Sequence, residues 1–334
     1  MLYDRGAFET FDLGARTISI GNITAGGTGK TPLVAYVAES LAAREEKVCI
    51  LTRGYGRKNA HKRVLVSDGE QILARPEEAG DEPFELAQKL LGKAVVIADA
   101  DRVSAAEWAK RKFGVTAFVL DDGFQHRRVK RDIDLVCIDA TNPFGGGKML
   151  PSGRLREPLV NLNRADIIVI TRANQAEDIS NLKSQISDLN ANAEIFEAKN
   201  DIVETVSLKE FHAKTQRTQS EEKSVLDDAG LTKHAAKSKP ALAFCGIGNP
   251  ESFFEQLRTE NFSVAAAETF RDHHIYTQQD VVSIENQAHK NGAEILFTTA
   301  KDAVKLLDLK FEIPCYVVEI KMNIDDAGTF LAML

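Results

Sequence analysis

The chain has 334 residues, 43% of them hydrophobic and 27% charged, which is ordinary for a soluble globular protein. This length exceeds what one hydrophobic core usually covers, so we expect two domains. The net charge of −7 gives no reason to expect a nucleic-acid partner, because non-specific binding to nucleic acid requires a basic surface.

The cysteines and the apolar runs indicate the compartment. The four cysteines are scattered singly without CxxC pairs, which predicts buried free thiols in a reducing compartment and no disulfide framework or zinc site. No apolar run approaches the roughly 20 residues that cross a bilayer, and the N-terminus lacks a signal-peptide pattern. We therefore expect a cytoplasmic protein, with peripheral membrane association left open. Nothing in the sequence implies a protein partner.

Short apolar runs alternate with amphipathic stretches in the first half of the chain, as in βαβ units with a parallel sheet. The runs lack polar alternation, which is expected for strands that are covered on both faces. A helix is predicted from about Thr31 to Arg44, after the first strand. The predicted strands are Thr17–Ile20, Val48–Thr52, Ala94–Ala98, Ala117–Leu120, Asp134–Asp139 and Ile167–Thr171.

The pattern changes at about Ala193. Two strands, Glu194–Ala198 and Ile202–Leu208, are predicted on either side of the turn residues 199–201, and the polar stretch 209–240 is predicted to be an exposed connector with room for one short helix. A second, smaller α/β unit follows, with strands Ala241–Gly246, Ile295–Thr299 and Cys315–Ile320 and a helix Glu251–Thr259. The expected division is residues 1–193 for the first domain, 194–239 for a two-stranded hinge and connector, and 240–334 for the smaller domain.

A glycine-rich loop follows the first strand and leads into the first helix, in the sequence GNITAGGTGKTP. Glycines let successive N–H groups turn toward one point, and the helix N-terminus adds positive charge, so the segment predicts a P-loop for a nucleoside triphosphate. Thr24 stands where the strict pattern has glycine, and Ala25 stands where partition-type ATPases carry an extra lysine. Lys30 is expected on the β- and γ-phosphates and the Thr31 hydroxyl on Mg²⁺. The predicted ATP-binding residues are Thr24, Ala25, Gly26, Gly27, Thr28, Gly29, Lys30 and Thr31.

A second motif, FVLDDGFQH, is an apolar strand that ends in Asp121 and Asp122. An acid at the carboxyl end of a strand beside a P-loop typically holds Mg²⁺. Because neighbouring residues of an extended chain point to opposite sides, one of the two is expected to face the metal. His126 follows the turn, and a lone histidine in such a place is more often structural.

Two further segments contain candidates for a general base. Asp81 lies in a GDEP loop before a predicted helix 84–91, where an acid commonly caps the helix, although a kinase also needs a carboxylate to accept the acceptor's proton. Asp272, His273 and His274 follow one another in the second domain, a pattern compatible with a surface loop, half of a metal site or part of a catalytic pair. A carboxylate–histidine pair is a usual way to tune a base toward neutral pH. If this segment is a strand, its two neighbouring histidines point to opposite sides, so at most one of them serves the site.

Arginines recur beside the predicted motifs, which is usually the mark of a solvated face. Near an ATP site they are also suited to binding a substrate phosphate, so an anionic acceptor is a reasonable expectation. They include Arg53, Arg102, Arg127, Arg128, Arg131, Arg154 and Arg156.

Eight segments in this order resemble one family, the tetraacyldisaccharide 4′-kinases of lipid A biosynthesis. They are GNITAGGTGKTP, LTRGYGR, GDEP, ADR, LDDGFQHR, LPSGRLREP, FRDHHIYT and KDAVK, and the resemblance extends from Leu2 to about Lys305. It implies two α/β/α domains joined by a two-stranded hinge. It also implies transfer of the ATP γ-phosphate to the 4′-hydroxyl of a tetraacylated glucosamine disaccharide 1-phosphate at the cytoplasmic face of the inner membrane.

Several residue roles are implied by the resemblance alone. Lys30 and Thr31 would serve ATP and Mg²⁺, and Asp121 or Asp122 the metal. Asp81 would be the general base, paired with a histidine of the DHH segment, most naturally His273. Arg102 and Asp122 would take part in catalysis, and Glu157 would lie near the metal. Arg53 and His126 would lie near the substrate head group.

The sequence departs from the family in two places. The hydrophobic helix that usually precedes the LYDRG segment is absent from this chain, which puts tight membrane residence in doubt. The TEKD-like segment reads Thr299-Ala300-Lys301-Asp302, so no role of its glutamate can be transferred. Two other functions stay open: a P-loop nucleotide switch or adaptor, and a kinase or ligase for a soluble small molecule.

Overall fold

The computed structural model describes residues 8–55, 57–216 and 233–334. Contacts divide the chain into two compact units, Met1–Lys199 together with Met322–Leu334, and Asn200–Lys321. The C-terminal segment from Met322 thus packs with the first unit, whereas the sequence analysis assigns it to the smaller domain. The LYDRG segment lies outside the described residues. Among those that are described, no helix combines the length and the hydrophobicity that crossing a bilayer requires.

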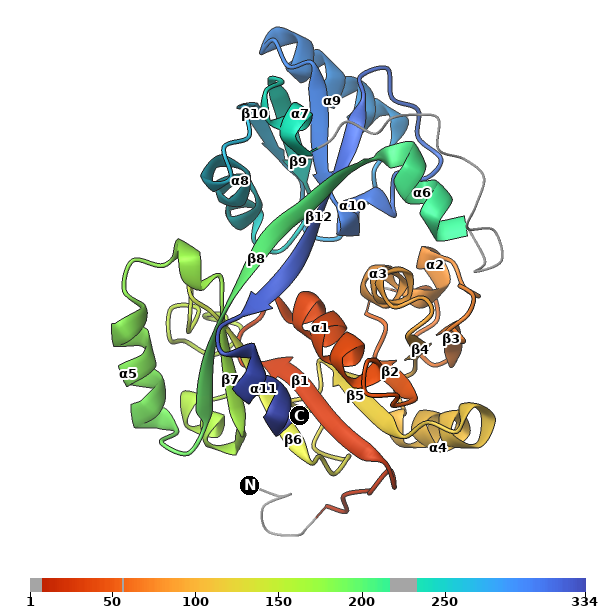
Figure 1. The fold of residues 1–334 in the computed structure, drawn as a ribbon, viewed down its shortest axis with the longest axis vertical. Helices are drawn as coiled ribbons and strands as arrows, with labels where there is room; N and C mark the ends of the chain where they lie inside the picture. The colour runs from red at the N-terminus through yellow and green to blue at the C-terminus, as the bar shows by residue number, and fades with distance from the viewer. Residues whose placement is uncertain (1–7, 56, 217–232) are drawn as a thin grey trace. The chain divides into compact units, whose positions relative to one another are not determined.

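The first unit is an α/β fold on a mostly parallel sheet, as predicted, with the strand order β8-β7-β6-β1-β5-β2-β4-β3 (Figure 1). Each neighbouring pair is parallel except β4–β3. Central strands are buried along their whole length, because helices cover both faces of the sheet. The strands are β1 (Arg16–Asn22), β2 (Val48–Thr52), β3 (Val64–Ser67), β4 (Ala94–Ala98), β5 (Ala117–Asp121), β6 (Ile133–Asp139), β7 (Ile167–Thr171) and β8 (Glu194–Ser207).

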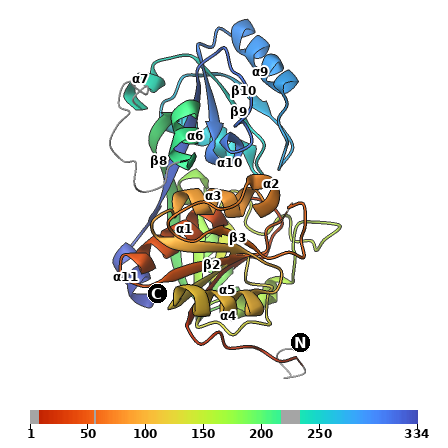
Figure 2. The same ribbon diagram turned by 90° about the vertical axis from the view of Figure 1, so that its right-hand side faces the viewer.

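The helices of this unit lie on the two faces of its sheet. Figure 2 shows α1 and α3 on one side of β2 and β3, and α4 on the other. Predicted and observed bounds agree within two residues for α1, but α3 begins at Asp81, three residues before the predicted helix, because proline is tolerated in the first turn of a helix. The helices are α1 (Lys30–Ala42), α2 (Pro76–Ala79), α3 (Asp81–Lys89), α4 (Arg102–Phe113), α5 (Ile179–Leu189) and α11 (Ala327–Met333), with short 3₁₀ turns at Leu159–Arg164 and Ala173–Gln175.

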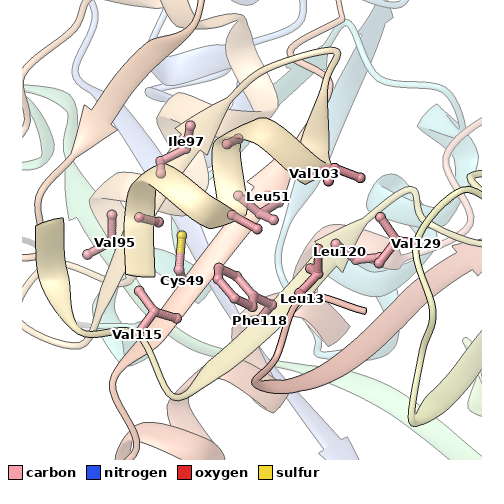
Figure 3. Close-up of a cluster of buried hydrophobic side chains, with 13 residues drawn as sticks. Leu13, Cys49, Leu51, Val95, Ile97, Val103, Val115, Phe118, Leu120 and Val129 are labelled. Atoms are coloured by element: carbon pink, nitrogen blue, oxygen red, sulfur yellow. The ribbon is translucent and has the colours of Figure 1, made fainter. Parts of the chain in front are cut away.

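One hydrophobic cluster joins α4 to the sheet (Figure 3). Alternate residues of three strands face the helix: Cys49 and Leu51, Val95 and Ile97, Phe118 and Leu120. This alternation follows from the two-residue period of a strand, and it fixes the register of β5, the strand that ends in Asp121. The core therefore sets the position of the acidic strand end.

The connection between the units differs from the prediction. Glu194–Ser207 is one continuous strand, β8, so the prediction of two strands joined by a turn at 199–201 was wrong. The three polar residues contain no glycine and continue in extended conformation. Besides β7, the neighbour of β8 in the sheet order is β12 (Cys315–Ile324), along which the chain returns to the first unit. Glu197 and Asp325, both in the first unit, bind each other through their main chains.

The second unit has its own four-stranded order, β10-β9-β11-β12, and the registers described for β10–β9, β9–β11 and β11–β12 are parallel. The predicted strand Ile295–Thr299 is observed with the same bounds. The elements are α6 (Leu208–Gln216), α7 (Lys233–Lys237), β9 (Ala241–Cys245), α8 (Pro250–Thr259), β10 (Val264–Thr269), α9 (Gln278–Lys290), β11 (Ile295–Thr299), α10 (Ala300–Ala303) and β12.

The predicted connector 209–240 is more structured than expected where it is described. Its ends form α6 and α7, and Phe211 and Ala236 are buried, so the prediction of an exposed segment was wrong for these ends. Each of these apolar side chains lies in a short helix among many polar residues, so the average composition of the segment does not indicate that they are buried. Residues 217–232 lie outside the described part of the chain.

We expect Phe118→Ala to lower the free energy of unfolding of the first unit by about 3–5 kcal/mol, because it leaves a cavity in a fully buried cluster. The chain's single tryptophan, Trp108, packs against this cluster, so urea unfolding followed by its fluorescence measures the change. Val160→Ala, at a residue that is 61% exposed, is the control and should change stability by less than about 0.5 kcal/mol. Equal stabilities of the two variants would contradict this core assignment.

Candidate functional site

The P-loop connects β1 to α1 at the carboxyl edge of the first unit's sheet. Gly26 has a φ of 118° and Gly29, the residue before the helix, a φ of 80°, so both occupy conformations that favour glycine. A Cβ atom on Gly26 would lie 2.1 Å from the Arg154 guanidinium. Arg154 and Ala25 bind each other twice, since the Ala25 N–H donates to the Arg154 carbonyl and Arg154 Nε donates to the Ala25 carbonyl. Arg154 thus holds the first part of the loop in place.

Lys30 lies at the centre of a charged cluster. Its ammonium donates to Asn22 Oδ1 at 3.1 Å and lies 3.7 Å from Asp122 Oδ1. Arg156 donates to both oxygens of Asp122, at 2.6 and 3.0 Å, and also to Asn22 Oδ1. Two cations and one carboxylate therefore meet beside the P-loop. Burial opposes ionisation of Asp122, but the hydrogen bonds from Arg156 and the charge of Lys30 prevail and lower its pKa to about 2.

The turn after β5 lets the two adjacent acids, Asp121 and Asp122, both lie near Lys30. Asp122 has a left-handed φ of 50°, so the assumption of an extended chain was wrong here, and Lys30 influences the pKa of both Asp121 and Asp122. Gly123 is required next, because a Cβ there would lie 2.6 Å from Ser19 Oγ. The buried Arg102 donates to the carbonyls of Asp121 and Asp122 and so holds this turn in place.

Asp121 is buried at the end of β5 and accepts a hydrogen bond from Thr52 at 2.9 Å. Burial, together with the negative charges of Glu82 and Asp122, raises its pKa to about 6. A carboxylate and the Thr31 hydroxyl are oxygen ligands of the kind Mg²⁺ prefers, and nucleotide-bound Mg²⁺ commonly takes only one or two protein ligands. The donor set around Lys30 therefore fits a magnesium–nucleotide complex.

Glu157 and His126 have surroundings that the sequence does not reveal. Both Glu157 oxygens accept hydrogen bonds, from Gln125 at 2.7 Å and from Asn161 and Arg164 at 2.8 Å, which favours a structural role over metal binding. His126 Nε2 is buried and has no hydrogen-bond partner among the described residues. Burial and nearby arginines lower the pKa of His126 to about 4, so the ring is neutral at pH 7.

Asp81 is the first residue of α3, and its position depends on a close approach of two loops. Gly80 has a φ of 92°, and a Cβ there would lie 2.7 Å from the Tyr55 carbonyl. The exposed Arg53, in the same loop as Tyr55, lies near enough to Arg102 to influence its pKa. Glu82, next to Asp81, acts in the same way on Asp121. The GDEP and RGYGR segments are thereby brought to the edge where β5 ends.

The DHH segment belongs to the second unit and follows the end of β10, so the strand considered for it was wrong. Asp272 accepts a hydrogen bond from Lys301 at 2.9 Å, and His273 has a left-handed φ of 61°. His274 stacks on Phe270 and binds Asp280 through Nε2 at 3.3 Å, which gives it a local structural role. The two histidines therefore have different surroundings because the chain turns at His273, and not because they alternate along a strand.

The segment Thr299-Ala300-Lys301-Asp302 forms the start of α10 in the second unit. Thr299 caps this helix through Asp302, whose carboxylate is fully buried and also accepts from the Gly246 N–H. Lys301 binds Asp272 and so connects this segment to the DHH turn.

Some residues around the P-loop were missed by the sequence analysis. Asn22 ends β1 and contacts Lys30 and Arg156, while Asp139 and Arg172 lie at the ends of β6 and β7 and form an ion pair. Their position at the carboxyl ends of neighbouring parallel strands is the signal that could have identified them.

A P-loop, an acidic strand end beside it and converging arginines define an α/β nucleotide-binding protein of the phosphotransferase class. A family model described as tetraacyldisaccharide-1-P 4′-kinase matches residues 1–334. The chain belongs to this family of kinases.

Individual relatives agree with the family match. The tetraacyldisaccharide 4′-kinase of Halothermothrix orenii is 40% identical, with 97% of this chain and 84% of the relative covered, and that of Geobacter metallireducens is 37% identical, with 92% and 83% covered. Among solved structures, LpxK from Aquifex aeolicus in complex with ATP has a TM-score of 0.73 and 27% identity, with 99% of this chain and 91% of that chain covered.

We expect Asp121→Asn to stabilise the nucleotide-free protein in a pH-dependent way. The raised pKa of Asp121 means that folding favours its protonated form, so its contribution to stability is complete below pH 4 and is lost as the pH rises through about 6. Asparagine is neutral and can still accept from Thr52. The gain should be near zero at pH 4 and on the order of 3 kcal/mol above pH 7, since one pKa unit corresponds to about 1.4 kcal/mol.

Thermal unfolding of both proteins without nucleotide or Mg²⁺, from pH 4 to pH 8, measures this difference. Asp188→Asn, at an exposed site on α5, is the matched control and should shift stability little at any pH. A gain for Asp121→Asn that is constant across the range would contradict the assignment.

Proposed function

We propose that the chain transfers the γ-phosphate of ATP to the 4′-hydroxyl of a tetraacylated glucosamine disaccharide 1-phosphate. Family membership over all 334 residues supports the kinase class and the acceptor. The observation that carries the chemistry is the cluster of Lys30, Arg156, Asp121 and Asp122 at the mouth of the P-loop. Cations placed there are suited to the charge on a transferring phosphoryl group.

ATP and Mg²⁺ are the cofactors of this proposal. Amides of the P-loop and the Lys30 ammonium would bind the phosphates, and Asp121 with the Thr31 hydroxyl would hold Mg²⁺, which offsets phosphate charge when bound. Asp121 is the better of the two acids for this role, because Asp122 already has both oxygens bound by Arg156. Arg102 supports both acids through their carbonyls, so its part in catalysis is positioning.

Asp81 is proposed as the general base that accepts the 4′-hydroxyl proton, with His273 as its partner. Asp81 stands in the first turn of α3, and its neighbour Glu82 lies near Asp121. The resemblance of the DHH segment to the family's motif supports His273 for this role, while the His274 ring stacks on Phe270 and binds Asp280. A partner for the base would tune its pKa toward the working pH.

The acceptor head group is anionic and its acyl chains are apolar. Arg53 is exposed and lies near enough to the buried Arg102 to influence its pKa, and the neutral His126 has a ring nitrogen without a hydrogen bond to any described residue. Both are therefore proposed to contact the sugar head group or its 1-phosphate. Because a tetraacylated substrate resides in a membrane, we propose that the enzyme works peripherally at the cytoplasmic face of the inner membrane, where ATP is present.

The acceptor is tested by mass analysis of tetraacyldisaccharide 1-phosphate, dispersed in detergent, after incubation with protein, ATP and Mg²⁺. We expect a product heavier by one phosphoryl group, and none with Lys30→Met, which removes the phosphate-binding cation. A nucleotide switch would hydrolyse ATP without regard to the glycolipid, and a kinase or ligase for a soluble molecule would leave the glycolipid unchanged. Either result would refute the proposed acceptor.

We expect Asp81→Asn to lower kcat by a factor on the order of 10²–10⁴, with little change in ATP affinity, because general-base catalysis contributes about this much. If His273 acts through Asp81, then His273→Ala should lower kcat as well, and the double variant should lose little more than Asp81→Asn alone. Asp188→Asn, which changes the same residue type at an exposed site, is the control. Unchanged kcat in Asp81→Asn, or losses that multiply in the double variant, would argue against the base or the pairing respectively.

A further inference from the structure

The P-loop of this chain is held from one side by the residues that end β7. Thr171 Oγ1 donates to the Thr28 carbonyl at 2.8 Å, and Arg172 Nη2 donates to the Gly27 carbonyl at 3.0 Å. The Thr171 side chain also fills the space beside Gly29, where a Cβ would lie 3.2 Å from it. Two adjacent residues of one strand end therefore contact three successive residues of the loop.

Arg172 is fixed in this position by its own partners. It has a left-handed φ of 56°, and its Nη1 pairs with Asp139 at the end of β6. Both side chains are largely buried, with 12% and 7% of their surface exposed. Asp139 is in turn bound through Oδ1 by the N–H and hydroxyl of Thr141. A buried ion pair in which Asp139 has a second partner of its own is a rigid support for Arg172.

Holding the two carbonyls determines where two amides point. In a planar trans peptide the C=O and N–H groups point in opposite directions. The Gly27 carbonyl faces Arg172 and the Thr28 carbonyl faces Thr171. The N–H groups of Thr28 and Gly29 therefore point away from β7. Neither N–H has a hydrogen-bond partner within the described ranges. They are available, next to the N-terminus of α1, to an anion such as a triphosphate.

We propose that Thr171 and Arg172 are positioning residues of the nucleotide site, which hold the P-loop so that the Thr28 and Gly29 amides face the phosphates. This inference rests on the proposed function, since it takes the loop's ligand to be ATP. Neither residue touches the reacting atoms in this role. Asp139 acts one step further away, by orienting Arg172.

Four variants test the proposal. Thr171→Val keeps the shape of the side chain but removes the donor, whereas Thr171→Ser keeps the donor. Arg172→Met removes both hydrogen bonds of the guanidinium, and Arg172→Lys keeps the charge beside Asp139. Arg258→Met, in an exposed ion pair of the second unit, is the matched control.

Affinity is measured by titration with a fluorescent ATP analogue in the presence of Mg²⁺ and by competition with inorganic tripolyphosphate. We expect Thr171→Val and Arg172→Met each to weaken both ligands about 3- to 10-fold, because each removes one hydrogen bond to a P-loop carbonyl. Thr171→Ser should stay within about twofold of the unaltered chain, Arg172→Lys should lie between, and Arg258→Met should match the unaltered chain. In kinetics, KM for ATP should rise while KM for the acceptor stays constant.

The outcomes separate this inference from the proposed function. Unaltered affinity in Thr171→Val, failure of Thr171→Ser to restore it, or weakening for ATP but not for tripolyphosphate would each overturn the positioning role. If the unaltered chain binds neither ligand, the ATP-dependent function falls and this inference with it. If it binds both but never phosphorylates the glycolipid, the acceptor is refuted while the comparison of variants still decides the role of Thr171 and Arg172.

Discussion

Lys30 and Asp122 lie 3.7 Å apart because two parallel strands that are neighbours in the sheet end at the same edge. β1 leads into the P-loop and β5 ends in the two acids, and their register brings the ends together. A parallel sheet collects side chains from segments far apart in sequence in this way, whatever chemistry they carry. The function of the first unit depends on this shared edge, and the buried strands beneath it keep the edge in register.

The P-loop itself supplies little of its own rigidity. Glycine allows its backbone conformation but also costs conformational entropy on folding, so other residues must hold the loop in place. Arg154 binds Ala25 on one side, and the strand end of β7 binds Gly27 and Thr28 on the other. A phosphate site whose amides are already aimed loses less free energy to reorganisation when the ligand binds.

Sequence alone was sufficient for the elements whose pattern is local. The buried strands Val48–Thr52 and Ile167–Thr171 are continuous apolar runs, and the glycines before Lys30 identify the loop between strand and helix. It failed where a long-range partner decides the conformation. The strand β8 continues through polar residues beyond its pairing with β7, and its other partner in the sheet is the distant strand β12. Asp122 adopts a left-handed conformation because Arg102 and Gly123 hold the turn. Likewise, no local pattern in the motif ITRAN indicates that Arg172 reaches a carbonyl 145 positions away.

The two adjacent acids illustrate how position divides their roles. Asp121 is closed in at the strand end with one neutral donor, Thr52, and its pKa is raised to about 6. Asp122 turns toward Arg156 and Lys30, and its pKa is lowered to about 2. Asp122 thus keeps a negative charge that orients the two cations, whereas the charge on Asp121 is costly until a cation offsets it. A nucleotide that brings a divalent cation to Asp121 and phosphates to Lys30 and Arg156 would satisfy both needs together, so the charges of this edge favour the complete complex over either part alone.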